Sequence, residues 1–185
     1  MKLVIVGGVA GGASAAARAR RLSETAEIVL FERGPDVSFA NCGLPYYVGG
    51  EIADRKKLLV TAPELLRTRF GLDVRTHSSV EAIDRAAKTV RVRDLASGRT
   101  YDETYDRLIL APGAAPLRPP LPGFDLPGIF ALRNLHDVDR IKERADRGAK
   151  RVVLLGGGFI SIELAENFVR RGIATTVVEK NEQIL

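Results

Sequence analysis

The chain has 185 residues, 45% hydrophobic and 28% charged, which suits a globular protein forming one large domain or parts of two. Its net charge of +5 arises from basic and acidic residues that alternate, which indicates a mixed solvated surface rather than a nucleic-acid-binding block. The single cysteine excludes a disulfide-stapled secreted scaffold, and no apolar run is long enough for a signal peptide or a membrane span. We therefore expect a cytoplasmic protein that binds neither nucleic acid nor membrane.

The first 32 residues predict a dinucleotide-binding unit. Lys2–Val6 is a short apolar strand, a glycine-rich turn follows, and an alanine- and arginine-rich helix covers about 11–22. A second apolar strand, 27–31, ends at Glu32. Glycine lets the backbone approach a pyrophosphate, and a helix N-terminus offers N–H groups and partial positive charge to that anion. A carboxylate after the second strand can accept hydrogen bonds from ribose hydroxyls.

The lone cysteine lies in the segment "SFANCGLPYYVGG", residues 38–50. Cys42 cannot form a disulfide within its own chain, so it is either an inert buried thiol or a reactive one. A thiolate is the reactive form of cysteine, and a helix N-terminus favours it. If Cys42 is the reactive thiol that the resemblance described below implies, we expect it at the start of a helix.

The middle of the chain does not follow the strand–turn–helix pattern of the first unit. Thr61-Ala-Pro-Glu64 predicts a capping box that opens a helix through Phe70. The segments "LDVRT", "VEAID", "KTVRVRD" and "TYDETYDRLILAPG" predict a small antiparallel meander. Residues 112–128 contain six of the nine prolines and predict a connector, which the amphipathic helix "NLHDVDRIKERADRG" follows. His77 and His136 have no companion at metal-ligand spacing, so no metal site is expected.

The segment "KRVVLLGGGFISIELAENFVRRGIATTVVE" repeats the plan of the first unit. It contains a strand, glycines, a helix ended by Gly172, and a strand ended by Glu179. Neither fingerprint is complete, because Val9 takes the middle glycine position of the first and Ser161 the third position of the second. For each copy, a glycine-rich strand–helix turn without a nucleotide remains the alternative.

The predicted fold is α/β. A Rossmann-like dinucleotide-binding domain, with a parallel sheet plus the small antiparallel meander, is followed by the first half of a second Rossmann-like domain. The resemblance described below implies that the first is the FAD-binding domain and the second the NAD(P)H-binding domain. The predicted bounds are 1–112 for the first domain, 113–147 for the connector and helix, and 148–185 for the second domain.

Together the two turns and Cys42 resemble the FAD-dependent pyridine nucleotide–disulfide oxidoreductases. The stretch "SFANCGLPYY" is similar to the single-cysteine coenzyme A disulfide reductase branch, which includes rhodanese-fused, persulfide-reducing relatives. The resemblance implies FAD-binding residues in and near the first turn: Gly7, Gly8, Val9, Ala10, Gly11, Gly12, Glu32, Arg33, Pro112 and Gly113. It implies nicotinamide-nucleotide-binding residues in the second unit: Gly156, Gly157, Gly158, Phe159, Ile160, Glu163 and Glu179.

The resemblance also implies that Cys42 is the redox nucleophile. Its thiolate would attack coenzyme A disulfide, and two electrons from NADH would pass through the flavin to regenerate it. The substrate-binding residues implied are Arg21, Ser38 and Asn41. The carboxylate of Glu179 favours NADH, because it repels a 2′-phosphate, while the neighbouring Lys180 leaves NADPH open.

Two alternatives remain. An NADH oxidase or peroxidase would cycle Cys42 through a sulfenic acid, and a non-catalytic nucleotide-binding fragment would perform no redox step. Because the second unit stops after its second strand, we expect a fragment of an enzyme, and the resemblance implies that the full-length enzyme is a homodimer. We expect this chain alone to be marginally stable or self-associating, with little turnover.

Overall fold

The computed structural model describes residues 1–184, and the chain divides into two compact units. The first unit comprises Met1–Phe39 and Leu59–Ala114, and the second comprises Ala40–Leu58 and the chain from Ala115 onward. This division assigns residues 40–58, which follow the first nucleotide-binding unit in sequence, to the second structural unit. The functional domain bounds given above remain a prediction.

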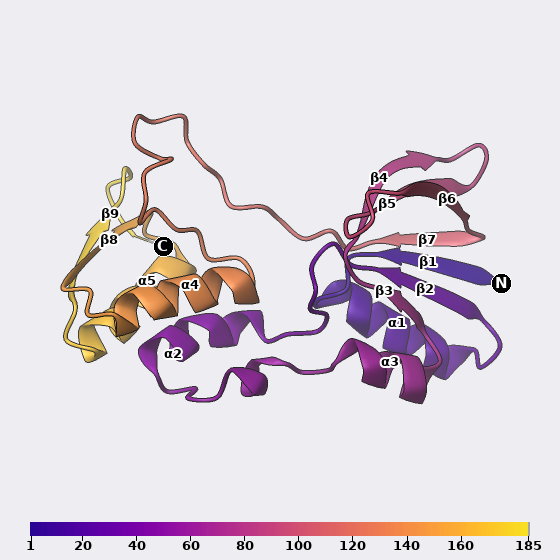
Figure 1. The fold of residues 1–185 in the computed structure, drawn as a ribbon, viewed down its shortest axis with the longest axis horizontal. Helices are drawn as coiled ribbons and strands as arrows, with labels where there is room; N and C mark the ends of the chain where they lie inside the picture. Colours follow the sequence, from indigo (N-terminus) through magenta and orange to yellow (C-terminus); the bar gives the residue numbers. More distant parts are fainter. Residues whose placement is uncertain (185) are drawn as a thin grey trace. The chain divides into compact units, whose positions relative to one another are not determined.

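The first unit is built on a four-stranded parallel sheet with strand order β3-β2-β1-β7 (Figure 1). Its strands are β1 (Lys2–Val6), β2 (Glu27–Phe31), β3 (Asp73–Arg75) and β7 (Arg107–Leu110). Its helices are α1 (Gly11–Leu22) and α3 (Pro63–Phe70), and an antiparallel meander contains β4 (Ser78–Asp84), β5 (Thr89–Asp94) and β6 (Thr100–Thr104).

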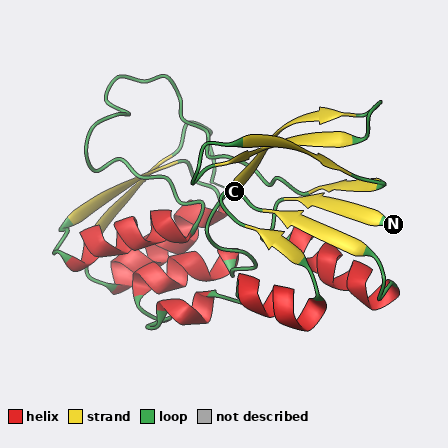
Figure 2. Ribbon diagram, turned by 45° about the vertical axis from the view of Figure 1, so that its right-hand side comes forward, coloured by secondary structure: helices red, strands yellow, loops and turns green. Residues whose placement is uncertain are grey.

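Both faces of the parallel sheet are covered, because successive side chains of a strand point to opposite faces. On one face, Leu3 and Ile5 of β1 pack with residues of α1 and α3. On the other, Val4 packs with Val90 and Val92 of the meander. The helices and the meander lie on opposite sides of the sheet in Figure 2. The first unit is therefore a three-layer α/β structure, as predicted.

Two details of the predicted first unit are wrong. The strands β3 and β7 belong to the parallel sheet and not to the meander. The reason for β3 is its connection, since the helix α3 returns the chain to the edge of the sheet and allows β3 to run parallel to β2. The capping box is also wrong, because the N-cap of α3 is Ala62 and no side chain caps this helix.

The second unit contains a two-stranded parallel sheet and a group of helices. Its strands are β8 (Arg151–Leu155) and β9 (Ala174–Val178), which lie in register from end to end. Its helical elements are η1 (Asn41–Gly43), α2 (Leu44–Gly49), η2 (Arg55–Leu58), α4 (Leu135–Asp146) and α5 (Phe159–Arg170). Within the described residues, no helix has the length and apolar character needed to cross a bilayer.

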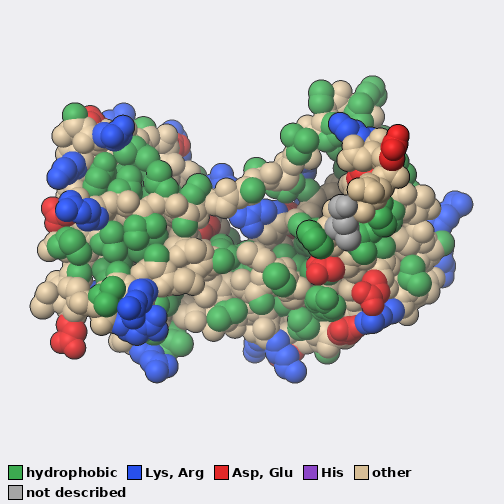
Figure 3. Space-filling model, turned by 180° about the vertical axis from the view of Figure 1, so that it is seen from behind, with side chains coloured by type: hydrophobic (Ala, Val, Ile, Leu, Met, Phe, Trp, Pro, Cys, Tyr) green, Lys and Arg blue, Asp and Glu red, His purple; other side chains and the backbone are tan. Residues whose placement is uncertain are grey.

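One face of the β8–β9 pair is open. Along both strands, partly buried residues alternate with exposed ones. The exposed set includes Val153, Leu155 and Val178, which are 59%, 57% and 49% exposed. Hydrophobic side chains are visible at several places on the face of the molecule drawn in Figure 3. The apolar sequences of β8 and β9 are typical of strands in a sheet that is buried on both faces. The described residues cover only one face of this pair.

Candidate active site

The first glycine turn is closely packed. Gly7 has φ +95°, a conformation that favours glycine, and its N–H donates to the carbonyl of Phe31 at 2.8 Å. A Cβ on Gly7 would lie 2.0 Å from the carbonyl oxygen of Ala111, and one on Gly12 would lie 1.7 Å from the carbonyl oxygen of Gly7. Both positions therefore require glycine, as the fingerprint predicts.

The carboxylate of Glu32 is bound directly to this turn. Its Oε2 accepts a hydrogen bond from Gly8 N–H at 2.7 Å, and its Oε1 accepts one from Gly34 N–H at 2.7 Å. The end of β2 thus holds a charged acceptor at the glycine turn, where the ribose of a bound dinucleotide is expected. Arg33, between Glu32 and Gly34, is exposed.

The predicted residues around the first turn divide into two groups. Ser38 N–H donates to the Gly8 carbonyl at 3.0 Å, and Pro112 Cα would lie 3.3 Å from a Cβ on Gly7, so both positions adjoin the turn. Arg21 lies near the opposite end of α1, roughly 15 Å along the helix from its first residue. Within the first unit, the structure therefore brings Ser38 and Pro112 to the turn but leaves Arg21 away from it.

The second glycine turn repeats this geometry. Gly156 has φ +94°, and its N–H donates to Val178 at 2.8 Å. Glu179 Oε2 accepts from Gly157 N–H at 2.6 Å, as Glu32 does from Gly8. Main-chain hydrogen bonds from Asn181 and then Gly157 hold the pKa of Glu179 below its usual value. Glu179 is therefore ionised at neutral pH and available to ribose hydroxyls.

The helices after both turns leave room for an anion. The N-cap residues are Ala10 for α1 and Gly158 for α5, and neither makes a side-chain cap hydrogen bond. Neither helix has an acidic residue in its first turn. The first-turn N–H groups and the helix dipole thus favour a phosphate, and the residues present fit two dinucleotide cofactors. Phe159 and Ile160, at the start of α5, are exposed at 75% and 54%.

Cys42 lies in η1, which leads directly into α2. It is a free, exposed thiol, as is required of a nucleophile and is not expected of a buried structural cysteine. The neighbouring Asn41 is also exposed, and its carbonyl accepts the Leu44 N–H. The position of Cys42 at the start of a helical segment agrees with the sequence-based expectation.

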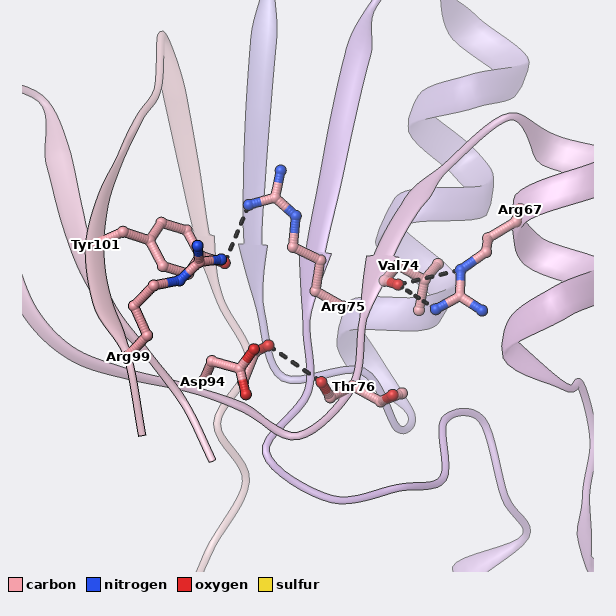
Figure 4. Close-up of a pocket in the computed structure, with 8 residues that line it drawn as sticks. Arg67, Val74, Arg75, Thr76, Asp94, Arg99 and Tyr101 are labelled. Carbon is pink, nitrogen blue, oxygen red and sulfur yellow. Dashed lines mark hydrogen bonds between the residues drawn. The ribbon is translucent and has the colours of Figure 1, made fainter. Parts of the chain in front are cut away.

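An open pocket of about 540 Å³ lies in the first unit, between α3, β3 and the meander (Figure 4). Three arginines line it, and each has a partner; the Arg99 guanidinium lies over the ring of Tyr101. Arg67 donates to the Val74 carbonyl, and Arg75 pairs with Asp73 and Glu103. None of the predicted site residues lines this pocket.

Three residues with structural roles near Cys42 were missed by sequence reasoning. Asn167 of α5 is fully buried, Gly49 of α2 packs against it, and Arg171 donates a hydrogen bond to Val48 of α2. The available signal was a polar residue, Asn167, on the apolar stripe of α5 beside Leu164 and Phe168.

Comparison with known protein families covers the whole chain. The family model "Pyridine nucleotide-disulphide oxidoreductase" matches residues 1–185. The chain belongs to this family. A curated member, the coenzyme A disulfide reductase of Staphylococcus haemolyticus, is 39% identical over 184 residues, which cover 99% of this chain and 41% of that protein. The chain thus spans about two fifths of the length of such curated pyridine nucleotide-disulphide oxidoreductases.

Solved structures of the family have the same fold. The reduced CoADR-RHD of Bacillus anthracis superposes with a TM-score of 0.96 at 50% identity, over 100% of this chain and 33% of that one. An NAD-dependent persulfide reductase from A. fulgidus gives a TM-score of 0.95 at 35% identity, over 100% and 34%. The water-forming NADH oxidase of Lactobacillus brevis, bound to NADH, gives 0.95 at 33%, over 100% and 40%.

Proposed function

We propose that this chain supplies the two nucleotide-binding turns and the nucleophile of a flavin-dependent NAD(P)H:disulfide reductase. The substrate class is coenzyme A disulfide or a related persulfide. The observation that carries the proposal is the exposed, lone Cys42 at the start of a helical segment, in a chain of the pyridine nucleotide-disulphide oxidoreductase family. Its similarity to a coenzyme A disulfide reductase and to a persulfide reductase supports this substrate class.

The proposed chemistry follows from the absence of a second cysteine in the sequence. The Cys42 thiolate attacks one sulfur of the substrate disulfide, a Cys42–S–S–CoA bond forms, and the first coenzyme A leaves as a thiolate that takes up a proton. A bound flavin would relay two electrons from the nicotinamide nucleotide. With those electrons the mixed disulfide is cleaved, the second coenzyme A leaves and the Cys42 thiolate returns.

The proposed cofactors are FAD at the turn of α1 and NADH at the turn of α5. The ionised Glu179 supports NADH, because a carboxylate accepts hydrogen bonds from a 2′-hydroxyl and repels a 2′-phosphate. Ser38, held beside the first turn, and Asn41, next to Cys42, remain proposed substrate contacts, as does Arg21.

The test is a stoichiometric reaction that needs no turnover. The FAD-reconstituted chain is mixed with coenzyme A disulfide and analysed by mass spectrometry, and we expect one coenzyme A adduct per chain. Its rate should exceed that of the urea-unfolded chain at least about tenfold, because a positioned thiolate outpaces a free cysteine. Adding NADH should then release the adduct. Cys42→Ser should form no adduct, and an adduct rate equal in folded and unfolded chains would refute the proposal.

A second candidate is NADH oxidation by oxygen, which the similarity to the Lactobacillus brevis enzyme favours. In that case Cys42 passes through a sulfenic acid. Dimedone trapping during NADH-dependent oxygen consumption separates the two. Oxygen consumption with a dimedone adduct on Cys42, and no reduction of coenzyme A disulfide, would establish the oxidase.

A further inference from the structure

The helix α2, which follows Cys42, cannot hold its position by itself. It has six residues, well below the roughly 12–15 that an isolated helix needs in water. Its placement must therefore come from tertiary contacts. Leu44, Pro45 and Val48 are buried, whereas Cys42 is exposed at the start of the same helical segment. Whatever holds α2 also determines where the Cys42 thiol stands.

Arg171 makes one of these contacts at the far end of α2. Its Nη1 donates to the carbonyl oxygen of Val48 at 2.8 Å, and its Nη2 donates to Asp146 Oδ1 at 2.6 Å. The N–H of Gly50 already serves the carbonyls of Tyr46 and Tyr47. The Gly50 N–H thus does not serve the Val48 carbonyl at the end of α2. The Arg171 guanidinium satisfies that carbonyl instead, and it joins α2 to the end of α4.

The charge of this junction is balanced. Burial alone would raise the pKa of Asp146, but hydrogen bonds from Arg171 and Lys142 outweigh it and hold the pKa below its usual value. Asp146 is therefore ionised at neutral pH. It orients the guanidinium with a charge-assisted bond, so that Nη1 faces α2. The Arg171 side chain is 20% exposed and that of Asp146 is 48% exposed, so the pair lies at the edge of solvent with the guanidinium on its more buried side.

Asn167, one helical turn before Arg171, makes the second contact. It is fully buried, and its Nδ2 donates to the Glu163 carbonyl at 2.8 Å, which fixes the orientation of the amide. Its Oδ1 has no hydrogen-bond partner among the described residues. A Cβ on Gly49 would lie 1.8 Å from that oxygen, so the Gly49 Cα–H lies against it. An apolar side chain would fill this site without an unpaired oxygen, so Asn167 is not explained by packing alone.

We propose that Arg171 and Asn167 are positioning residues for Cys42. They fix the C-terminal end of α2 against α5. Because Cys42 lies at the other end of the same helical segment, the position of α2 determines the position of the thiol. The inference rests on the proposed function only in giving Cys42 the role of nucleophile. It deepens that function by making α5, the helix that opens at the second glycine turn, also the support of the cysteine segment.

The lone cysteine permits a direct test on the full 185-residue chain. A nitroxide is attached to Cys42, and its mobility is read by electron paramagnetic resonance. Amide hydrogen exchange is measured on the unlabelled chain for Gly50 and Ile52, whose N–H groups bind the Tyr46 carbonyl. In Arg171→Met, we expect a more mobile nitroxide and about tenfold faster exchange of both amides, equivalent to about 1.4 kcal/mol. Exchange in β8 and β9 should remain unchanged.

Two further variants separate positioning from stability. Arg171→Lys keeps a donor for Val48 and should restore both readouts to within about threefold of the unmodified chain. Asn167→Leu removes the unpaired oxygen, so the urea midpoint should hold or rise while the nitroxide becomes more mobile. The matched control is Arg147→Met, which removes an exposed arginine at the C-cap of α4 that pairs with Glu143 and should leave both readouts unchanged.

Two results would overturn the inference. One is a nitroxide spectrum and an exchange rate that are the same in Arg171→Met and Arg147→Met. The other is equal acceleration of exchange in α2, β8 and β9, which would mean that Arg171 holds the whole unit together rather than α2. A Cys42→Ser variant that still forms a coenzyme A adduct would refute the proposed function alone, because these readouts involve no substrate.

Discussion

The third glycine position shows how the same fingerprint meets different surroundings. In the first turn, a Cβ on Gly12 would collide with the Gly7 carbonyl, whereas the second turn has Ser161 at the matching place. The neighbours of the first glycine differ as well. Gly7 is backed by Ala111 after β7, while a Cβ on Gly156 would meet nothing within 4 Å. The first turn is tight because its strand has neighbours on both sides.

Gly12→Ala should therefore destabilise the first unit by about 3 kcal/mol or more, because the added methyl overlaps main-chain atoms that cannot move aside. Because Ser161 stands at the place of Gly12 in the second turn, the comparison there is Gly158→Ala, at the middle glycine position, where the new methyl would meet nothing within 4 Å. It should cost about 1 kcal/mol or less, as expected at an N-cap. Urea unfolding followed by circular dichroism measures both. Equal losses would contradict the packing difference between the turns.

Glu179→Gln should reduce the preference for NADH. The amide no longer repels a 2′-phosphate, so we expect the ratio of the Kd values for NADPH and NADH to fall about tenfold. Titration calorimetry on the chain measures the two constants. Glu182→Gln, three residues farther on and exposed, is the control and should leave the ratio unchanged. An unchanged ratio in Glu179→Gln would remove this carboxylate from nucleotide selection.

At the scale of elements, the parallel sheet and the meander are tied by a charge network. Glu103 of β6 accepts from Lys2 of β1 at 2.5 Å and from Arg75 of β3 at 2.5 Å. Burial alone would raise the pKa of Glu103, but these hydrogen bonds outweigh it and hold the pKa below its usual value. The Glu103 side chain is only 12% exposed, so the network is weakly screened. It is therefore a site where acid should weaken the first unit.

The lowered pKa of Glu103 determines how the stability of the first unit depends on pH. Because the pKa of Glu103 is lower in the folded than in the unfolded chain, its stabilisation is fully present above about pH 4.5 and is lost as the pH falls through the folded value. The urea midpoint of the first unit should fall between pH 5 and pH 3, by an amount equivalent to about 1–3 kcal/mol.

Glu103→Gln should be less stable at pH 7, and its urea midpoint should fall less between pH 5 and pH 3. This fall of the midpoint with acid is called the acid limb. The control is Glu81→Gln, which removes a more exposed carboxylate paired with Arg93 and should keep the acid limb of the unmodified chain. An identical acid limb in Glu103→Gln would exclude this carboxylate as the cause.

At the scale of the whole molecule, the two units differ in how their sheets are covered. The sheet of the first unit is covered on both faces, whereas the β8–β9 pair leaves Val153, Leu155 and Val178 about half exposed. Exposed apolar faces of this kind associate in water, since burial of apolar area is favourable by about 25 cal/mol per Å². The exposed face of β8 and β9 is therefore the surface through which we expect the isolated chain to self-associate.

The double variant Val153→Thr and Val178→Thr should shift the isolated chain toward monomer in sedimentation velocity. Threonine keeps the shape and the β-propensity of valine but replaces a methyl by a hydroxyl. The control is Leu22→Thr, which changes an apolar residue that is 69% exposed at the end of α1 in the other unit. Monomer in the unmodified chain, or no shift in the double variant, would contradict the expectation.

The sequence by itself determined the local features. The strand–turn–helix periods, the glycines, and the acids at the strand ends identified both nucleotide-binding units, because these patterns report interactions between residues fewer than about 30 positions apart. Cys42 was singled out by residue type and setting, and its role as a nucleophile stays a prediction; the structure shows it exposed at the start of a helical segment.

Only the tertiary structure decided which strands pair and what supports the cysteine. The strands β3 and β7 join the parallel sheet, and residues 40–58 belong with the second unit. The bond from Arg171 to Val48 spans 123 positions. Contacts over such separations leave no periodic trace in one sequence, since they depend on where the whole fold brings the chain. The sequence could single out Cys42 as the proposed nucleophile, but it could not show the contacts that α2 makes with Asn167 and Arg171.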